Sequence, residues 1–185
     1  MERIGDQISK MSKQKSAAKS IPNISNLLNG GKLPPQALDL EEAVLGALML
    51  EGDPVNDAID ILRPEAFYKD AHQRIYGAIQ DLFASSDKID ILTVTQKLRS
   101  KGELDLVGGP YYISQLTNRV ASTAHVETHA RIIVQKFISR ELIRISSEII
   151  KNAYDDTTDV FDLLNQAESN LFGVAEGNIR KQYDS

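Results

Sequence analysis

The sequence predicts an all-α protein: a small globular multi-helix head followed by an antiparallel helical hairpin. Residues 123–154 include neither Pro nor Gly, and their apolar residues recur at the steps of one helix face. The pattern returns over residues 159–172, after a polar break at 155–158. Because this break is short, we expect two antiparallel helices.

The predicted hairpin carries more apolar surface than its two helices can bury against each other. One row on the first helix runs from Val126 to Ile149, and a second row consists of Ile132, Ile143 and Ile150. Monomers rarely expose a continuous apolar surface of this kind. We therefore expect self-association with a second copy of the chain through Ile132, Ile133, Phe137, Ile143 and Ile150.

Four segments are expected from these patterns. Residues 1–32 are polar and basic and are expected to form a flexible tail. Residues 33–120 form the head and 121–173 the hairpin, with Ser122 and Thr123 as caps and Gly173 as the helix end. Residues 174–185 are polar and resemble the start of a linker.

Five short helices are expected in the head. Asp39 and Glu42 have the spacing of a capping box at the start of the first. Pro54 suits the first turn of the second helix, and Asp70 caps the third. Their expected core residues are Leu40, Ala43, Val44, Ala47, Leu48, Leu50, Val55, Ala58, Ile59, Leu62, Ile75, Ala78, Ile79, Leu82 and Phe83.

Residues 89–94 leave two alternatives open. Their apolar content resembles a short strand, but Asp90 and Thr93 equally fit the cap and first turn of a helix ending before Gly102. Residues 108–110 open the fifth helix. The core residues expected from here on are Leu104, Leu106, Val107, Tyr112, Ile113 and Leu116.

Composition excludes several classes of protein. The chain has no Cys, which excludes disulfides, thiolate metal sites and a cysteine nucleophile and fits a cytoplasmic protein. No apolar run is long enough for a membrane span, and the N-terminus lacks a secretory signal. The net charge of −5 divides into +4 over residues 1–32 and −9 over the rest. The acidic body repels phosphate, so its charged partners are expected to be protein surfaces.

No catalytic or metal-binding residue is predicted. Gly31-Lys32 lacks the remainder of a phosphate-binding loop. His125 and His129 share a helix face, but the sequence offers no third ligand beside them. The acidic pair Glu41-Glu42 is expected to be solvated or to cap a helix. Tyr112 is expected to pack in the core and Tyr111 to be partly exposed, although such a pair can also stack on bases.

Four stretches resemble the N-terminal domain of the bacterial replicative DNA helicase DnaB. They are PPQALDLEEAVLGALML (34–50), FYKDAHQRIY (67–76), IDILTV (89–94) and LRSKGELDLVGGPYYISQL (98–116), in family order and spacing. The resemblance extends over about residues 33–173. It implies a head and hairpin, with hairpins that pair two chains and three such dimers forming a collar on a hexameric ring.

The resemblance also implies partners. The family collar binds the C-terminal region of primase and, in some bacteria, a helicase loader at the replication fork. ATP, Mg²⁺ and the 5′–3′ unwinding of DNA belong to a RecA-like motor domain after the linker, so this chain is expected to hold no cofactor. Partner contacts are expected at Tyr111, Arg119, His125, Glu127 and Arg131. The alternative is a nucleic-acid-binding accessory module that acts through the basic tail.

Overall fold

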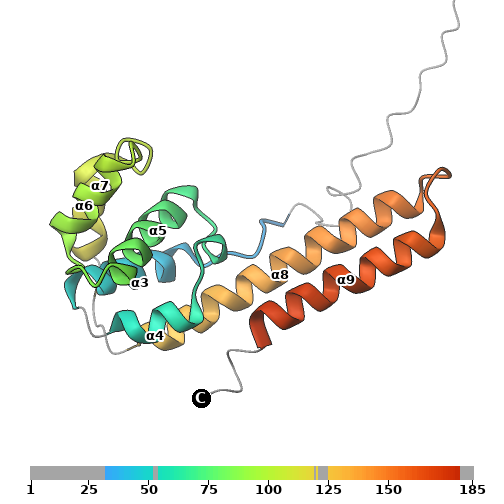
Figure 1. Cartoon of the computed structure of the whole chain (residues 1–185), viewed down its shortest axis with the longest axis horizontal. Helices are drawn as coiled ribbons and strands as arrows, with labels where there is room; N and C mark the ends of the chain where they lie inside the picture. The colour runs from blue at the N-terminus through green and yellow to red at the C-terminus, as the bar shows by residue number, and fades with distance from the viewer. Residues whose placement is uncertain (1–31, 52–53, 119, 121–124, 180–185) are drawn as a thin grey trace, which may run out of the picture. The chain divides into compact units, whose positions relative to one another are not determined.

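The computed structural model describes residues 32–51, 54–118, 120 and 125–179, and every regular element in these ranges is helical (Figure 1). The all-α prediction is confirmed. In chain order the elements are α3 (Leu38–Leu50), α4 (Pro54–Ile61), the 3₁₀ helix η1 (Pro64–Ala66), α5 (Asp70–Ala84), α6 (Ile91–Ser100), α7 (Gly109–Asn118), α8 (Val126–Ala153) and α9 (Val160–Ile179).

The chain divides into two units, Met1–Lys32 and Leu33–Ser185. The predicted basic tail lies, apart from Lys32, outside the described residues, as do the predicted caps Ser122 and Thr123. Helices α3 to α9 and η1 all belong to the second unit.

Helix α3 lies among the other head helices and contacts α4, α5, α6, α7 and α8. Its side chains Val44, Leu45 and Leu48 are fully buried in the head core. Its approach to α7 requires glycine at position 46, because a Cβ atom there would collide with the main-chain carbonyl of Leu116. A buried helix of this kind needs apolar residues around most of its circumference, which the run of residues 43–50 supplies.

The predicted burial of three residues is wrong. Leu50, Phe83 and Leu106 are exposed, although each continues an apolar pattern in the sequence. Leu50 and Phe83 lie near the ends of α3 and α5, where the helix surface is no longer covered by neighbours. Both line an open groove of about 610 Å³ together with residues 86–90.

The predicted capping box of Asp39 and Glu42 is also wrong. Helix α3 begins at Leu38, and its N-cap Ala37 makes no side-chain capping bond. Likewise α5 begins at Asp70 itself, after Lys69. Both helices pack against other helices of the head, and such tertiary contacts cannot be predicted from the local sequence.

The alternative at residues 89–94 is resolved in favour of a helix. The Asp90 carboxylate accepts hydrogen bonds from the backbone N–H groups of Leu92 and Thr93, both at 3.0 Å. The Thr93 hydroxyl accepts in turn from the Asp90 N–H at 2.9 Å, which completes a capping box at the start of α6. Gly102, at φ +71°, follows the end of the helix as predicted.

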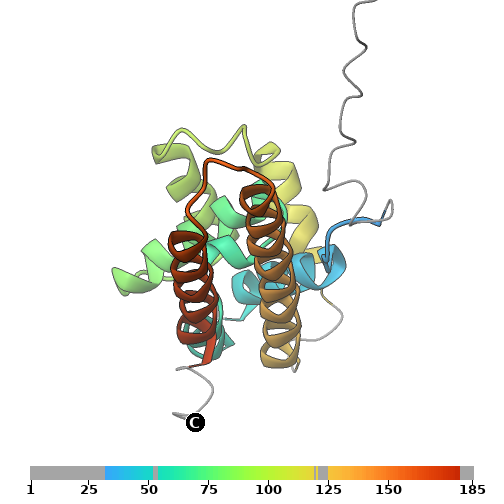
Figure 2. The same ribbon diagram turned by 90° about the vertical axis from the view of Figure 1, so that its right-hand side faces the viewer.

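Helix α8 packs against the head along its first half and against α9 along its second half. Val126, Ala130 and Ile133 belong to the head core, whereas Ile145 is buried outside that core. Figures 1 and 2 show α8 and α9 side by side in antiparallel orientation. No helix in the described ranges is long and apolar enough to cross a membrane.

The predicted end of the second hairpin helix at Gly173 is wrong, because α9 continues to Ile179. The expected linker 174–185 therefore begins as helix. Glycine inside a helix costs only about 1 kcal/mol relative to alanine, so it weakens α9 without ending it. The residues Val174 to Glu176 that follow it are compatible with a helix.

Candidate interaction surfaces and a buried polar network

One face of α9 is apolar and exposed. Its large side chains recur at the spacing of a single helix face, and Phe161 at the centre of the first turn is 77% exposed. Helix α8 adds Leu142 and Ile143. The exposed residues of the α9 face are Val160, Phe161, Leu164, Leu171 and Phe172.

Helix α9 carries a second, less exposed row. Leu163, Ala167, Asn170 and Val174 are partly buried at three- and four-residue steps. This spacing places them on one face of α9, and α8 is the helix against which α9 packs. The larger apolar residues of α9 therefore remain available to a partner.

The structure places the predicted self-association residues in different environments. Ile133 is 1% exposed and lies in the head core, so its assignment to an interface with a second chain is corrected. Phe137 is partly buried against the same core, and Ile132 and Ile150 are also partly buried. Ile143 is exposed. The sequence reasoning missed the face of α9, although the periodic apolar residues of α9 were visible in it.

The predicted partner-binding residues lie at the start of α7 and over the start of α8. Tyr111 is 73% exposed, and His125 is exposed as the N-cap residue of α8. Glu127 and Arg131 form an ion pair on α8 with an N–O distance of 2.8 Å. Arg119 lies outside the described residues.

Histidine and acidic residues build no metal site in the part of the chain that the structure describes. The rings of His125 and His129 are 6.3 Å apart, with an angle of 54° between their planes. Both histidines lie at the start of α8, where the sequence predicted a helix start.

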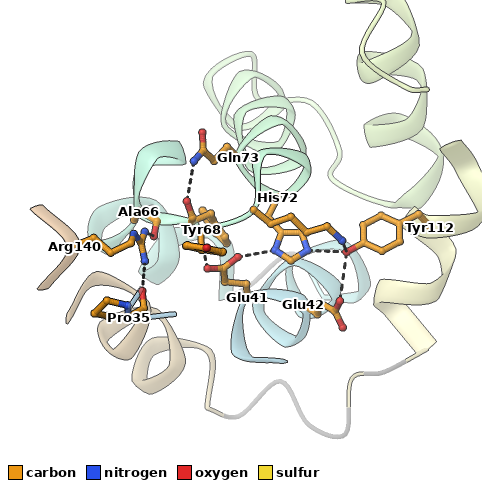
Figure 3. A network of polar contacts seen from close by, with 11 residues as sticks. Pro35, Glu41, Glu42, Ala66, Tyr68, His72, Gln73, Tyr112 and Arg140 are labelled. Carbon is orange, nitrogen blue, oxygen red and sulfur yellow. Dashed lines mark hydrogen bonds and ion pairs between the residues drawn. The ribbon is translucent and has the colours of Figure 1, made fainter. Parts of the chain in front are cut away.

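Glu41 on α3 and His72 on α5 lie at the centre of a buried polar network (Figure 3). Glu41 Oε2 is 2.6 Å from His72 Nδ1, and Glu41 Oε1 accepts a hydrogen bond from the Tyr68 N–H at 2.7 Å. The expectation that Glu41 is solvated is therefore wrong. Burial of a carboxylate requires hydrogen-bond partners, and both of its oxygens have one.

The network continues from His72 to the partly exposed Tyr112 on α7. His72 Nε2 lies 2.7 Å from the Tyr112 hydroxyl, which also accepts a hydrogen bond from Lys69 Nζ at 2.7 Å. The Tyr112 hydroxyl lies 3.4 Å from Glu42 Oε1. Since His72 is fully buried, no substrate can reach it, and the arrangement is suited to holding α3, α5 and α7 together.

Arg140 connects α8 to the same region of the head. Its guanidinium donates from Nη1 to the Pro35 carbonyl at 2.9 Å and from Nη2 to the Ala66 carbonyl at 2.7 Å. It also lies over the rings of Tyr68 and Phe137, at 5.5 and 5.7 Å from their centroids. Burial lowers the pKa of Arg140, and the negative charge of Glu41 opposes this effect.

Comparison with protein families finds one match over most of the head and the first part of α8. The model of the DnaB-like helicase N terminal domain matches residues 33–135. The chain is 46% identical to the replicative DNA helicase DnaB of Rhodothermus marinus over 151 residues, 82% of this chain and 16% of that protein. It is 37% identical to the replicative DNA helicase DnaC of Bacillus subtilis, over 83% of this chain and 34% of that protein.

Solved structures agree with the fold. The N-terminal domain of DnaB helicase from Mycobacterium tuberculosis matches with a TM-score of 0.71 and 31% identity, over 76% of this chain and 99% of that one. A DnaB-like replicative helicase, described together with its interactions with primase, matches with a TM-score of 0.61 and 26% identity, over 80% of this chain and 35% of that one. The chain spans only about a sixth to a third of the length of the curated relatives described above.

Proposed function

This chain belongs to the DnaB-like helicase N-terminal domain family, and from that premise we propose that it is the assembly and docking domain of a replicative DNA helicase. The observation that carries the proposal is the exposed apolar face of α9, headed by Phe161 and Leu164. The polar network of the described residues is centred on the buried pair Glu41 and His72, and no cluster of histidine and acidic residues there could hold a metal ion. We therefore assign the function to the exposed surfaces.

The proposed assembly pairs two hairpins through the α9 face, with Leu142 and Ile143 of α8 at its side. Water leaves the apolar side chains when the two faces meet, which favours association. A stable interface of this kind covers on the order of 800 Å² per chain. Three such dimers would then form the collar of a hexameric ring.

Sedimentation velocity tests the assembly. The wild-type chain should sediment as a dimer or larger species, and Leu164→Asp should weaken the association about tenfold or more, equivalent to about 1.4 kcal/mol, because it introduces an unpaired charge. The control Gln166→Glu adds the same charge at an exposed position on the side of α9 that points away from the apolar face. A wild-type chain that remains monomeric at high concentration, or equal effects of the two variants, would contradict the proposed assembly.

The proposed docking partners are the C-terminal region of primase and, in some bacteria, a helicase loader. The primase interactions described for the structural neighbour support primase as a partner. Exposed Tyr111 and the start of α8 provide the surface. In calorimetry with the cognate primase region, Tyr111→Ala should weaken binding, whereas Tyr154→Ala, at an equally exposed tyrosine at the other end of α8, should not. Absence of binding heat and of a complex would reject the docking role.

The parent protein is proposed to be an ATP-dependent 5′–3′ DNA helicase, with ATP and Mg²⁺ bound by its motor domain. The replicative helicases among the relatives support this extension. The chain of residues 1–185 should then hydrolyse ATP no faster than a buffer control. ATP hydrolysis by the purified chain would contradict the assignment of catalysis to a separate domain.

A second candidate function is nucleic-acid binding through residues 1–32, which carry a net charge of +4. Such binding should fall steeply with salt, because cationic side chains displace counterions from phosphates. Removal of residues 1–32 should then abolish DNA binding in an anisotropy assay. Equal DNA binding with and without these residues would exclude it.

A further inference from the structure

The two halves of α8 have different neighbours, and Arg140 lies where they meet. Before it, Ile133 is buried in the head core and Phe137 packs partly against that core. After it, Leu142 and Ile143 are exposed, and the buried residue Ile145 is not part of the head core. Apolar packing on the head therefore ends about one helical turn before Arg140.

Arg140 binds a segment of the head that is held in place by other hydrogen bonds. Its Nη2 donates to the carbonyl of Ala66, at the end of η1. In the following residues, the Phe67 carbonyl accepts from Gln73 Nε2 at 2.8 Å, and the Tyr68 N–H donates to Glu41 at 2.7 Å. The segment that receives the guanidinium is thus connected to α5 through Gln73 and to α3 through Glu41 (Figure 3).

The geometry requires arginine. Two hydrogen bonds run from two nitrogens of one planar group to carbonyls of Pro35 and Ala66, which lie 105 and 74 residues away in the sequence. The same plane lies near the ring of Tyr68. Lysine keeps the positive charge but concentrates it on one nitrogen, so it cannot reproduce the fork or the stacking.

Arg144, one turn further along α8, has a different kind of contact. It pairs with Glu141 at 3.1 Å and with Glu148 at 3.2 Å, both on its own helix. These ion pairs lie within α8, so they do not connect α8 to the head. Arg144 is therefore a matched control for Arg140.

We propose that Arg140 is a positioning residue that sets the direction in which the hairpin leaves the head. Its two bonds to main-chain carbonyls fix the point at which α8 passes from the head to α9. Without them, α8 can bend beyond Phe137, and the exposed face of α9 takes a range of orientations. The consequence for ring assembly rests on the proposed function, because a collar closes only when each hairpin presents its face at one angle.

Double electron–electron resonance tests the direction of the hairpin, because it measures the distance between one spin label on the head and one on the hairpin. The chain has no native Cys, so Ser100→Cys on the head and Asp156→Cys beyond the tip of α8 are labelled selectively, both at exposed positions. Dilution with unlabelled protein restricts the signal to distances within one chain. The doubly labelled chain with no further substitution should give a narrow distribution of distances. Arg140→Lys should give a broader distribution, and Arg144→Lys should leave the width unchanged.

The proposal would be overturned if the distance distribution of Arg140→Lys were as narrow as that of the labelled chain without this substitution. It would also be overturned if Arg144→Lys broadened the distribution as much as Arg140→Lys does. If Arg140→Lys does not fold, Gln73→Ala gives the second test. This variant retains Arg140 but frees the Phe67 carbonyl, and it should also broaden the distribution. Unchanged width in Gln73→Ala would then overturn the proposal.

Assembly is measured separately. By sedimentation, Arg140→Lys should raise the dissociation constant of the assembly about tenfold, equivalent to about 1.4 kcal/mol, with Arg144→Lys unchanged. A chain that never associates, but whose hairpin direction depends on Arg140, contradicts the proposed function and leaves the role of Arg140 intact. An assembly that forms normally with a broadened hairpin distribution contradicts the link between the two.

Discussion

Glu41 Oε2 on α3 lies 2.6 Å from His72 Nδ1 on α5, and the two side chains are 1% and 0% exposed. Glu41 also accepts the N–H of Tyr68, so the His72 Nδ1 proton faces the second oxygen. Nε2 of the same ring can accept from the Tyr112 hydroxyl when the ring is neutral, or donate to it when the ring is charged. This contact connects α5 with α7.

Removal of the Glu41 carboxylate should destabilise the head strongly. Glu41→Ala leaves His72 Nδ1–H and the Tyr68 N–H without acceptors in a buried site, and breaking a buried pair of this kind costs about 3–5 kcal/mol. Urea denaturation followed by circular dichroism measures the loss. Glu65→Ala, at an exposed residue of η1, should change stability by no more than about 0.5 kcal/mol. Equal stability of the two variants would show that the Glu41–His72 pair does not stabilise the head.

The Tyr112 hydroxyl should contribute to stability although its residue is partly exposed. Tyr112→Phe removes the group that meets His72 Nε2 and Lys69 Nζ, at a cost of about 1–2 kcal/mol for hydrogen bonds with charged or buried partners. Tyr111→Phe removes the same hydroxyl from the adjacent exposed ring and should leave the urea midpoint unchanged. A Tyr112→Phe variant as stable as Tyr111→Phe would place the hydroxyl outside the stabilising network.

The cap of α6 should give a pH-dependent contribution. Asp90→Ala should cost about 1 kcal/mol at neutral pH. The pKa of Asp90 lies below its ordinary value, chiefly because the carboxylate accepts the N–H of Thr93 and secondarily because Lys88 is near. A folded-state pKa below the unfolded one means that the contribution is complete above the ordinary value of 3.8 and is lost as the pH falls through the folded value.

Thermal unfolding of wild type and Asp90→Ala at several pH values measures this effect. The two curves should be furthest apart at neutral pH and should converge in acid. Asp87→Ala, at an exposed acidic residue just before the cap, is the control and should differ little from wild type at any pH. A constant difference between Asp90→Ala and wild type down to pH ~2 would contradict the assigned role of the charge.

The helices and the hairpin were predictable because their signals are local. The apolar spacing of α8, the proline at the start of α4 and the glycine after α6 each act within a few residues of the helix that they define. At residues 89–94 the sequence narrows the choice to strand or helix, with Asp90 and Thr93 as capping candidates. The reciprocal bonds between these two residues decide it in favour of the helix.

The buried network was not predictable, because charged residues are mostly exposed and local sequence supports that reading for Glu41. Its partner His72 is 31 residues away, and Arg140 reaches carbonyls still more distant. For α9, the sequence contains two apolar rows and does not identify the row that faces α8. The smaller row around Ala167 is the less exposed one, and the larger row around Leu164 is exposed.

Two glycines inside helices should respond to alanine in opposite directions. At Gly46 of α3, a Cβ atom would collide with the Leu116 carbonyl and the Val120 side chain, so α3 and α7 would have to separate. Overpacking of this kind costs about 1–3 kcal/mol. At Gly77 of α5, no atom lies within 4 Å of a Cβ atom, and alanine should stabilise the helix by about 0.4–1 kcal/mol. Urea midpoints that move in the same direction for Gly46→Ala and Gly77→Ala would contradict the close packing of α3 on α7.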